Sequence, residues 1–211
     1  MAGTTQQRDH TDGVHDRRRE WPIEDMHNVL VFTRSLADGG HRTCQNLLPI
    51  TSEQDYNAVS LIFSASHLNG TDWWTDTTER PPKQAVLIDA TPSPAGQITR
   101  SERDSVTVRH VDSPSNLTQI GIELSQLPEE LAAVDSTVVC VRSLTTLLQY
   151  VETEPAYRFL NLVTDRIVAM DGFGHFHIDP AAHSEQTINT LASLFDAVLE
   201  PDEQGGLTPA R

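Results

Sequence analysis

Short runs of apolar residues recur along this chain, and segments with helical periodicity separate them. Continuous apolar runs are typical of strands buried on both faces of a parallel sheet, because neither face of such a strand meets water. We therefore predict an α/β domain with three α/β/α layers, in which helices cover both faces of a mostly parallel central sheet. The predicted strands are residues 28–32, 58–63, 85–90, 137–141 and 172–179, with an edge strand at 105–111.

The segments between the strands predict helices from the spacing of their apolar residues. Residues 117–131 carry leucines and isoleucine at helical spacing, and Asp112 or Ser113 is the expected N-cap, with Pro114 in the first turn. Further helices are predicted through residues 41–48, over 143–151, from Pro155 onward, and from a Ser184 cap through Val198.

The two ends of the chain lack this pattern. Residues 1–25 are polar and aperiodic, so we expect a disordered tail there. Residues 201–211 predict a flexible C-terminal tail for the same reason, which leaves residues 26–200 as the folded domain. A chain of 211 residues is long enough to bury a sizeable core in one domain.

Charge is the most unusual property of the composition. The chain has 30 acidic and 15 basic residues, a formal net charge of −15, and Lys83 as its single lysine. Multimolar salt shortens the range of repulsion between surface acids to roughly 3 Å, so this composition favours a halophilic protein. Few cations remain to neutralise phosphates, and we expect no nucleic-acid partner.

No apolar run approaches the roughly 20 residues that span a bilayer, and the sequence begins without the apolar core of a signal peptide. We therefore expect a cytoplasmic protein that does not enter the membrane.

The two cysteines, Cys44 and Cys140, each lie within an apolar stretch. Neither belongs to a CxxC pair, so we interpret them as buried free thiols rather than as a disulfide or a zinc site.

The segment HFHIDPAAHSE, residues 175–185, concentrates histidines and acids. On a strand, His175, His177 and Asp179 would share one face, because side chains alternate with period two. Two histidines and a carboxylate are candidate ligands for zinc or iron, and thus for a small metal-dependent enzyme. Alternatively the segment is the end of a strand leading into a helix, which needs no metal.

The run VVCVRSLTTLLQYVETEPAYRFLNLVTDRI, residues 138–167, resembles the KaiC-like branch of the RecA superfamily. HIDPAAHSEQTINTLASLFDAVLE, residues 177–200, is similar to the end of that domain. The resemblance extends over residues 26–200 and is specific to a family of haloarchaeal KaiC-like proteins of unknown function. It implies a RecA-like fold and, by analogy, domains that assemble side by side.

Two departures from the ATPase members of this group bear on activity. A phosphate-binding loop reads GxxxxGK[ST], whereas the matching stretch TRSLADGGHRTCQNLL, residues 33–48, has adjacent glycines and only Arg42 before a threonine. The resemblance also places an Mg²⁺-holding aspartate just before Ser-Leu-Thr, where this chain has Arg142. A fixed cation cannot ligate a metal.

These departures predict a pseudo-ATPase with no catalytic residues, acting as a regulatory or interaction domain through a protein partner or self-association. The alternative is a nucleotide-binding protein or weak ATPase in which Arg42 and Arg142 contact the phosphates of Mg-ATP. Asp89 and Glu123 are acids near the expected ligand-binding edge of the sheet, but they belong to no recognisable catalytic set.

Overall fold

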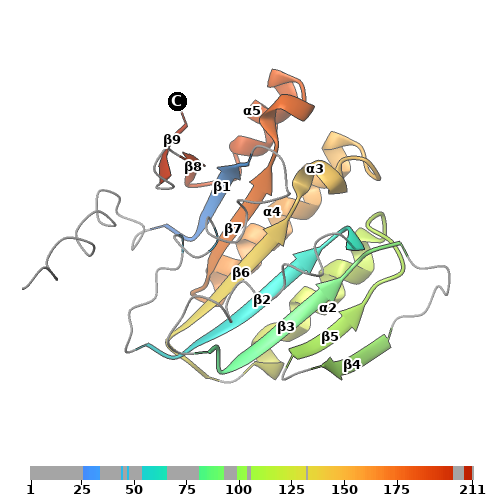
Figure 1. Ribbon diagram of the computed structural model, residues 1–211, viewed down its shortest axis with the longest axis vertical. Coiled ribbons are helices and arrows are strands. Elements are labelled where there is room, and N and C mark those ends of the chain that lie inside the picture. Colours follow the sequence, from blue (N-terminus) through green and yellow to red (C-terminus); the bar gives the residue numbers. More distant parts are fainter. Residues whose placement is uncertain are drawn as a thin grey trace, which may run out of the picture.

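The computed structural model describes residues 26–33, 44, 47, 54–65, 81–92, 99–103, 106–131, 133–201 and 207–210. In these residues, strands form one nine-stranded sheet in the order β4-β5-β3-β2-β6-β7-β1-β8-β9 (Figure 1). The strands are β1 (Asn28–Phe32), β2 (Tyr56–Ile62), β3 (Gln84–Asp89), β4 (Thr99–Arg103), β5 (Val106–His110), β6 (Ser136–Arg142), β7 (Phe173–Ile178), β8 (Ala197–Pro201) and β9 (Leu207–Pro209). Every neighbouring pair from β5 to β8 is parallel, and only β4 and β9 add antiparallel edges. The predicted α/β class and mostly parallel sheet are confirmed.

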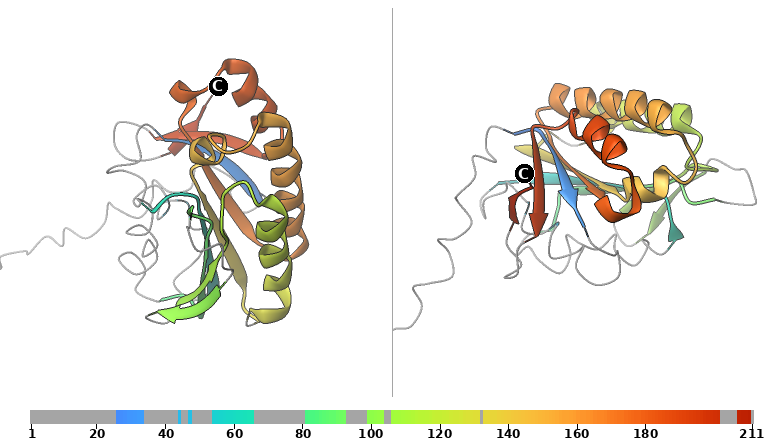
Figure 2. Two further views of the ribbon diagram at one scale, coloured as in Figure 1. Left: turned by 90° about the vertical axis from the view of Figure 1, so that its right-hand side faces the viewer. Right: turned by 90° about the horizontal axis from the view of Figure 1, so that it is seen from above.

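The described helices are α2 (Leu117–Glu130), α3 (Leu144–Leu147), α4 (Thr153–Ala169), the 3₁₀ helix η3 (Pro180–Ala182) and α5 (Glu185–Ala192). Two of them, α2 and α4, lie side by side on one face of the sheet (Figure 2). Within the described part of the chain, no helix combines the length and apolar character needed to cross a membrane.

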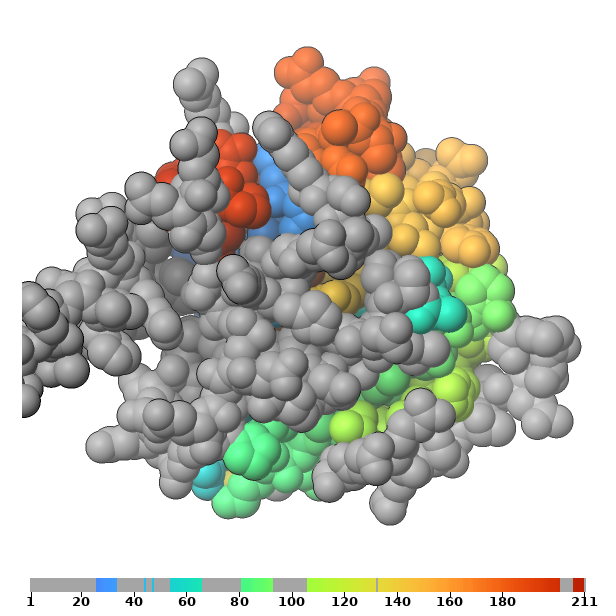
Figure 3. Space-filling view, viewed as in Figure 1, coloured from blue at the N-terminus to red at the C-terminus, as the bar shows by residue number. Residues whose placement is uncertain are grey.

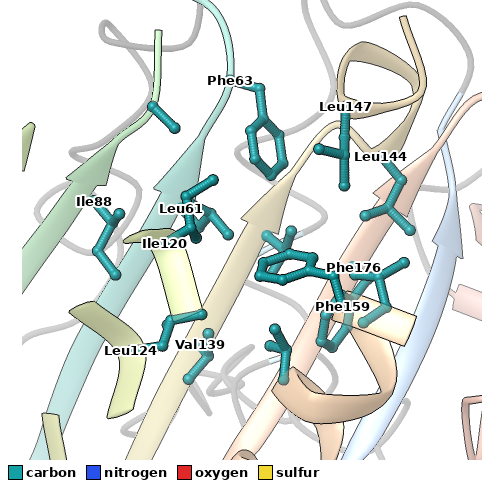
Figure 4. Packing of buried hydrophobic residues seen from close by; sticks show 14 of the residues in the cluster. Leu61, Phe63, Ile88, Ile120, Leu124, Val139, Leu144, Leu147, Phe159 and Phe176 are labelled. Atoms are coloured by element: carbon teal, nitrogen blue, oxygen red, sulfur yellow. The ribbon is translucent and has the colours of Figure 1, made fainter. Parts of the chain in front are cut away.

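The main core fills the space between the sheet and these helices. Each helix turns one apolar stripe toward the strands, because residues three and four apart share a face. Alternate strand residues point into the same layer. Figure 4 shows this packing, with Ile120 and Leu124 of α2, Phe159 of α4, and Val139 and Phe176 from the sheet.

The opposite face of the sheet carries a second buried cluster. Val29, Val31 and Val138 contribute to it, together with Cys44 and Leu47 from the connection between β1 and β2. Of the helix predicted over 41–48, only these last two residues are described, and the N–H of Leu47 donates to the carbonyl of Cys44 at 3.3 Å. Leu144 and Leu147 of α3 and Leu191 of α5 also belong to the main core. Because the described residues show no helical layer over the second cluster, the structure confirms the α/β class but not the predicted third layer.

The ends of several elements differ from the predictions. α2 begins later than expected, because Asn116, and not Asp112 or Ser113, accepts the capping hydrogen bond from the N–H of Gln119. The helix predicted over 143–151 shortens to the single turn α3. Ser184 does cap α5, accepting from the N–H of Thr187, and Pro155 does lie in the first turn of α4.

Long-range pairing explains the larger differences. The last helix was expected to continue through Val198, but it ends at Ala192, and the segment after it pairs with β1 as β8. The expected flexible tail 201–211 contains β9, which pairs with β8. The strand predicted at the edge, β5, lies inside the sheet because β4 pairs with its outer side. The predicted tail 1–25 lies outside the described residues.

We predict that Gly174→Ala lowers the free energy of unfolding by about 1–3 kcal/mol, because overpacking strains a filled core. A Cβ at this position of β7 would lie 2.7 Å from Oδ1 of Asn28 and 2.7 Å from Cδ1 of Ile167. Urea unfolding followed by circular dichroism in multimolar KCl measures the change.

Gly121→Ala is the matched control, since a Cβ at Gly121 of α2 meets nothing within 4 Å. Alanine is up to about 1 kcal/mol more favourable than glycine inside a helix, so this variant should be at least as stable as the parent. Equal destabilisation by the two substitutions would contradict the packing argument.

Candidate metal centre

Neighbouring strands β6 and β7 bring three candidate ligands together. In their parallel register, Cys140 lies opposite His175. His177 is two residues further along β7, so its side chain emerges on the same face as that of His175. This is the face opposite α2 and α4, since Val139, Val141 and Phe176, at the alternate positions, point into the main core.

Cys44, from the connection between β1 and β2, completes the group. Its Sγ lies 3.8 Å from Sγ of Cys140 and 3.4 Å from Nε2 of His177, and Nδ1 of His175 lies 3.0 Å from the same Nε2. One donor atom from each of the four residues falls within 4.8 Å of all the others. Such a Cys₂His₂ group can surround a single cation.

The group is buried among apolar side chains. Cys44, Cys140 and His175 have no exposed surface and His177 is 3 % exposed. Polar groups removed from water in this way cost free energy unless they are paired with one another or with an ion. The four donors therefore have to satisfy one another, or share a ligand, inside the second cluster.

The two thiols are electrostatically distinct. Burial raises the pKa of Cys44, but the hydrogen bond from Cys140 and the two histidines outweigh it, so the pKa of Cys44 lies well below that of an ordinary thiol. Burial and the same interaction with Cys44 raise the pKa of Cys140. The interaction between the two thiols thus favours ionisation of Cys44 over ionisation of Cys140. Burial lowers the pKa of His175, which favours the neutral imidazole that binds metals.

Arg142, at the end of β6, extends the group. Its Nη2 donates to Sγ of Cys44 at 3.4 Å, and the side chain is only 6 % exposed. Burial alone would lower the pKa of Arg142, but Cys140 and Cys44 raise it. The guanidinium is thus a fixed positive charge held against Sγ of Cys44, and as placed it does not project to the surface where a phosphate would contact it.

Asp179 is separate from this group, although the period of the strand put it on the same face. β7 ends at Ile178, and the carboxylate of Asp179 accepts from the N–H of Ala181 at 3.0 Å, capping η3. Its own N–H donates to Oγ1 of Thr145 at 2.9 Å. Asp179 therefore closes the strand end onto α3.

His183 shares that joint. Its Nε2 lies 3.1 Å from Oγ1 of Thr145, and burial lowers the pKa of His183 although Asp179 opposes the effect. A neutral imidazole can accept a hydrogen bond from the hydroxyl of Thr145 while the oxygen of that hydroxyl accepts from the N–H of Asp179. The two ends of this segment thus differ: His175 and His177 belong to the buried group, and Asp179 and His183 to a structural joint.

The other residues singled out in the sequence lie apart from the group. Arg42 falls outside the described residues. Asp89 lies 3.2 Å from Nδ1 of His110 and accepts from the N–H of Thr91. Glu123 is buried on α2, with its carboxylate 3.6 Å from Arg109. These acids are engaged in structural contacts rather than gathered around the cysteines and histidines.

The chain belongs to the DUF7504 family, a family of unknown function whose model matches residues 27–201. No curated protein matches the sequence.

Among solved structures, the chain is similar to one described as a structural study of PH0250 from Pyrococcus horikoshii OT3. The TM-score is 0.52 at 12 % identity, and the match covers 87 % of this chain and 85 % of that one. A weaker similarity, with a TM-score of 0.37 and 12 % identity, is to the cytoplasmic domain of EssC; it covers 85 % of this chain and 32 % of that one. The first likeness supports the α/β fold.

We predict that Thr145→Val lowers the free energy of unfolding by about 1–2 kcal/mol, because the N–H of Asp179 and the ring of His183 lose their shared partner. Thermal and urea unfolding in multimolar KCl measure the loss. Thr190→Val on exposed α5 is the control and should change stability by less than about 0.5 kcal/mol. An unchanged Thr145 variant would show that this joint contributes nothing.

Proposed function

We propose that this protein is a non-catalytic regulatory or interaction domain built on a RecA/KaiC-like frame. The observation that carries the proposal is the environment of Arg142. ATPase members of the resembling group have a Mg²⁺-holding carboxylate at this position. This chain instead places a buried guanidinium there, which donates a hydrogen bond to Sγ of Cys44. A cation there opposes the binding of Mg²⁺ rather than supporting it.

The residues at the carboxyl ends of β6 and β7 support the same conclusion, because their side chains are engaged in contacts within the protein. Ligands of open α/β sheets bind outside the carboxyl ends of the strands. At the end of β6, Arg142 turns toward Cys44, and Ser143 adopts a left-handed backbone conformation with φ of 67° and caps α3. At the end of β7, Asp179 caps η3. In the space-filling view, the atoms of α3 and α5 project together at this end of the molecule (Figure 3).

The phosphate-binding loop adds a further argument. ATP carries several negative charges, and such a loop normally holds them with backbone N–H groups and a lysine. The sequence supplies neither the loop pattern nor that lysine.

The alternatives have less support. Phosphate contact by Arg142 would require it to leave Cys44. A metal-dependent enzyme built on His175, His177 and Asp179 loses its carboxylate to η3, and the two cysteines lie beside the histidines as further potential ligands.

The remaining role is contact with other proteins, either copies of the same chain or a relative that retains ATP binding. Side-by-side assembly is what the resemblance implies. The acidic composition supports a halophilic protein, and the resemblance implies an archaeal source and a cytoplasmic role.

We predict that titration of Mg-ATP into the purified protein in multimolar KCl produces no saturable heat, because neither phosphates nor Mg²⁺ find their usual partners. The titration is repeated at several temperatures, because the binding enthalpy can be zero at any one of them and would then hide binding. An ATP-binding RecA-like protein titrated in the same buffer is the positive control.

Saturable heat that disappears in Arg142→Ala would contradict the proposal and establish Arg142 as a nucleotide contact. Saturable heat that persists in that variant would also contradict it and would direct attention to Arg42.

A further inference from the structure

We infer that Cys44, Cys140, His175 and His177 form a closed tetrahedral Zn²⁺ site that fastens the β1–β2 connection to strands β6 and β7. This site is independent of the proposed function, since it stands whether or not ATP binds. It also differs from the ligand set predicted from the sequence, in which Asp179 took part and the cysteines did not.

The donor atoms select the metal. Two thiolate sulfurs and two imidazole nitrogens are the ligands of structural zinc sites, whereas Mg²⁺ and Ca²⁺ require oxygens. Once Asp179 is set aside, the group contains no carboxylate. Zn²⁺ accepts tetrahedral coordination without an electronic preference, so the protein alone determines the geometry.

The distances match that geometry. With Zn–S bonds near 2.3 Å, two tetrahedral ligand sulfurs lie about 3.8 Å apart; Sγ of Cys44 and Sγ of Cys140 are 3.8 Å apart. A sulfur and a nitrogen lie about 3.6 Å apart in such a site, against 3.4 Å from Cys44 to His177. Two nitrogens lie about 3.3 Å apart, against 3.0 Å between His175 and His177. The other three separations lie within 4.8 Å, so the four donors would draw closer together when they bind the ion.

The architecture makes the site structural rather than catalytic. Four protein ligands fill a tetrahedral shell and leave no position for water or substrate. The almost complete burial of all four residues keeps solvent away from the ion. A catalytic zinc site would instead show three protein ligands and an open side.

Arg142 acts as the outer partner of the site. Two thiolates neutralise the charge of Zn²⁺, and the guanidinium that donates to Sγ of Cys44 stabilises that ligand in its deprotonated form. Outer hydrogen bonds of this kind orient ligands and tune metal affinity, typically by about 10–100-fold.

The consequence is a link between distant parts of the chain. Cys44 is 96 residues from Cys140 and 133 from His177. Cys44 lies on the face opposite α2 and α4, and one ion would tie it to β6 and β7 in the middle of the sheet. Metal binding would then contribute directly to folding.

The first test is the metal content and coordination of the untagged protein, purified without chelators in multimolar KCl. Elemental analysis should find one Zn²⁺ per chain, and X-ray absorption at the zinc edge should give two sulfur and two nitrogen neighbours. Protein free of metal that also fails to take up added Zn²⁺, or zinc bound through oxygen, would overturn the inference.

Variants assign the ligands. Cys140→Ser and His177→Gln should each reduce bound zinc to a small fraction of the parent's, whereas Asp179→Asn, the matched control, should retain it. Loss of zinc in Asp179→Asn with retention in Cys140→Ser would overturn the inference in favour of the ligand set predicted from the sequence.

A measurement on the parent protein covers the case in which ligand variants do not fold. Zinc is removed with a chelator and replaced by Co²⁺, and the absorption spectrum is recorded. Intense thiolate-to-cobalt charge-transfer bands with tetrahedral d–d bands are expected, and a lower melting temperature for the metal-free form. A spectrum without thiolate bands would refute the site without any substitution.

Discussion

The register between β6 and β7 is the constraint on which the rest of the molecule depends. It places Cys140 beside His175 on one face, and on the other face it places Val141 beside Phe176, in the main core. A slip of one residue would exchange the two faces of either strand, bringing polar donors under α4 and valines beside Cys44. The apolar core and the candidate metal centre are therefore specified by the same pairing, and neither can be altered alone.

The spacing of apolar residues was sufficient to predict the elements whose structure is set by their own sequence. The central strands β1, β2, β3, β6 and β7 and the helices α2, α4 and α5 lie where the apolar spacing indicated. The sequence could not reveal β8 and β9, because a short segment such as Ala197–Pro201 becomes a strand only when it pairs with the edge of β1, which is remote in sequence. Similarly, β4 turned β5 from an edge strand into an interior one.

In the candidate site, too, some residues could be found from the local sequence and others only from contacts between distant segments. His175 and His177 could be found from the sequence because period two places them on one face of a strand. The cysteines could not be found in this way, since neither forms a local motif. Cys44 and Cys140 are 96 residues apart, and their proximity arises only in the folded chain. Asp179 was assigned to the wrong environment because the alternation was extended one residue beyond Ile178, where the chain leaves the strand to begin η3. Ligand sets drawn from distant segments are therefore poorly predicted by spacing alone.

Arg142 connects the two proposals physically. A carboxylate at this position could serve Mg²⁺ at the edge of the sheet, but it would offer no hydrogen-bond donor to Sγ of Cys44, which Arg142 provides. The guanidinium of Arg142 instead opposes a divalent ion at the edge of the sheet and stabilises the deprotonated form of Cys44. The residue that argues against Mg²⁺ binding is thus also the one that donates to a ligand of the proposed zinc site.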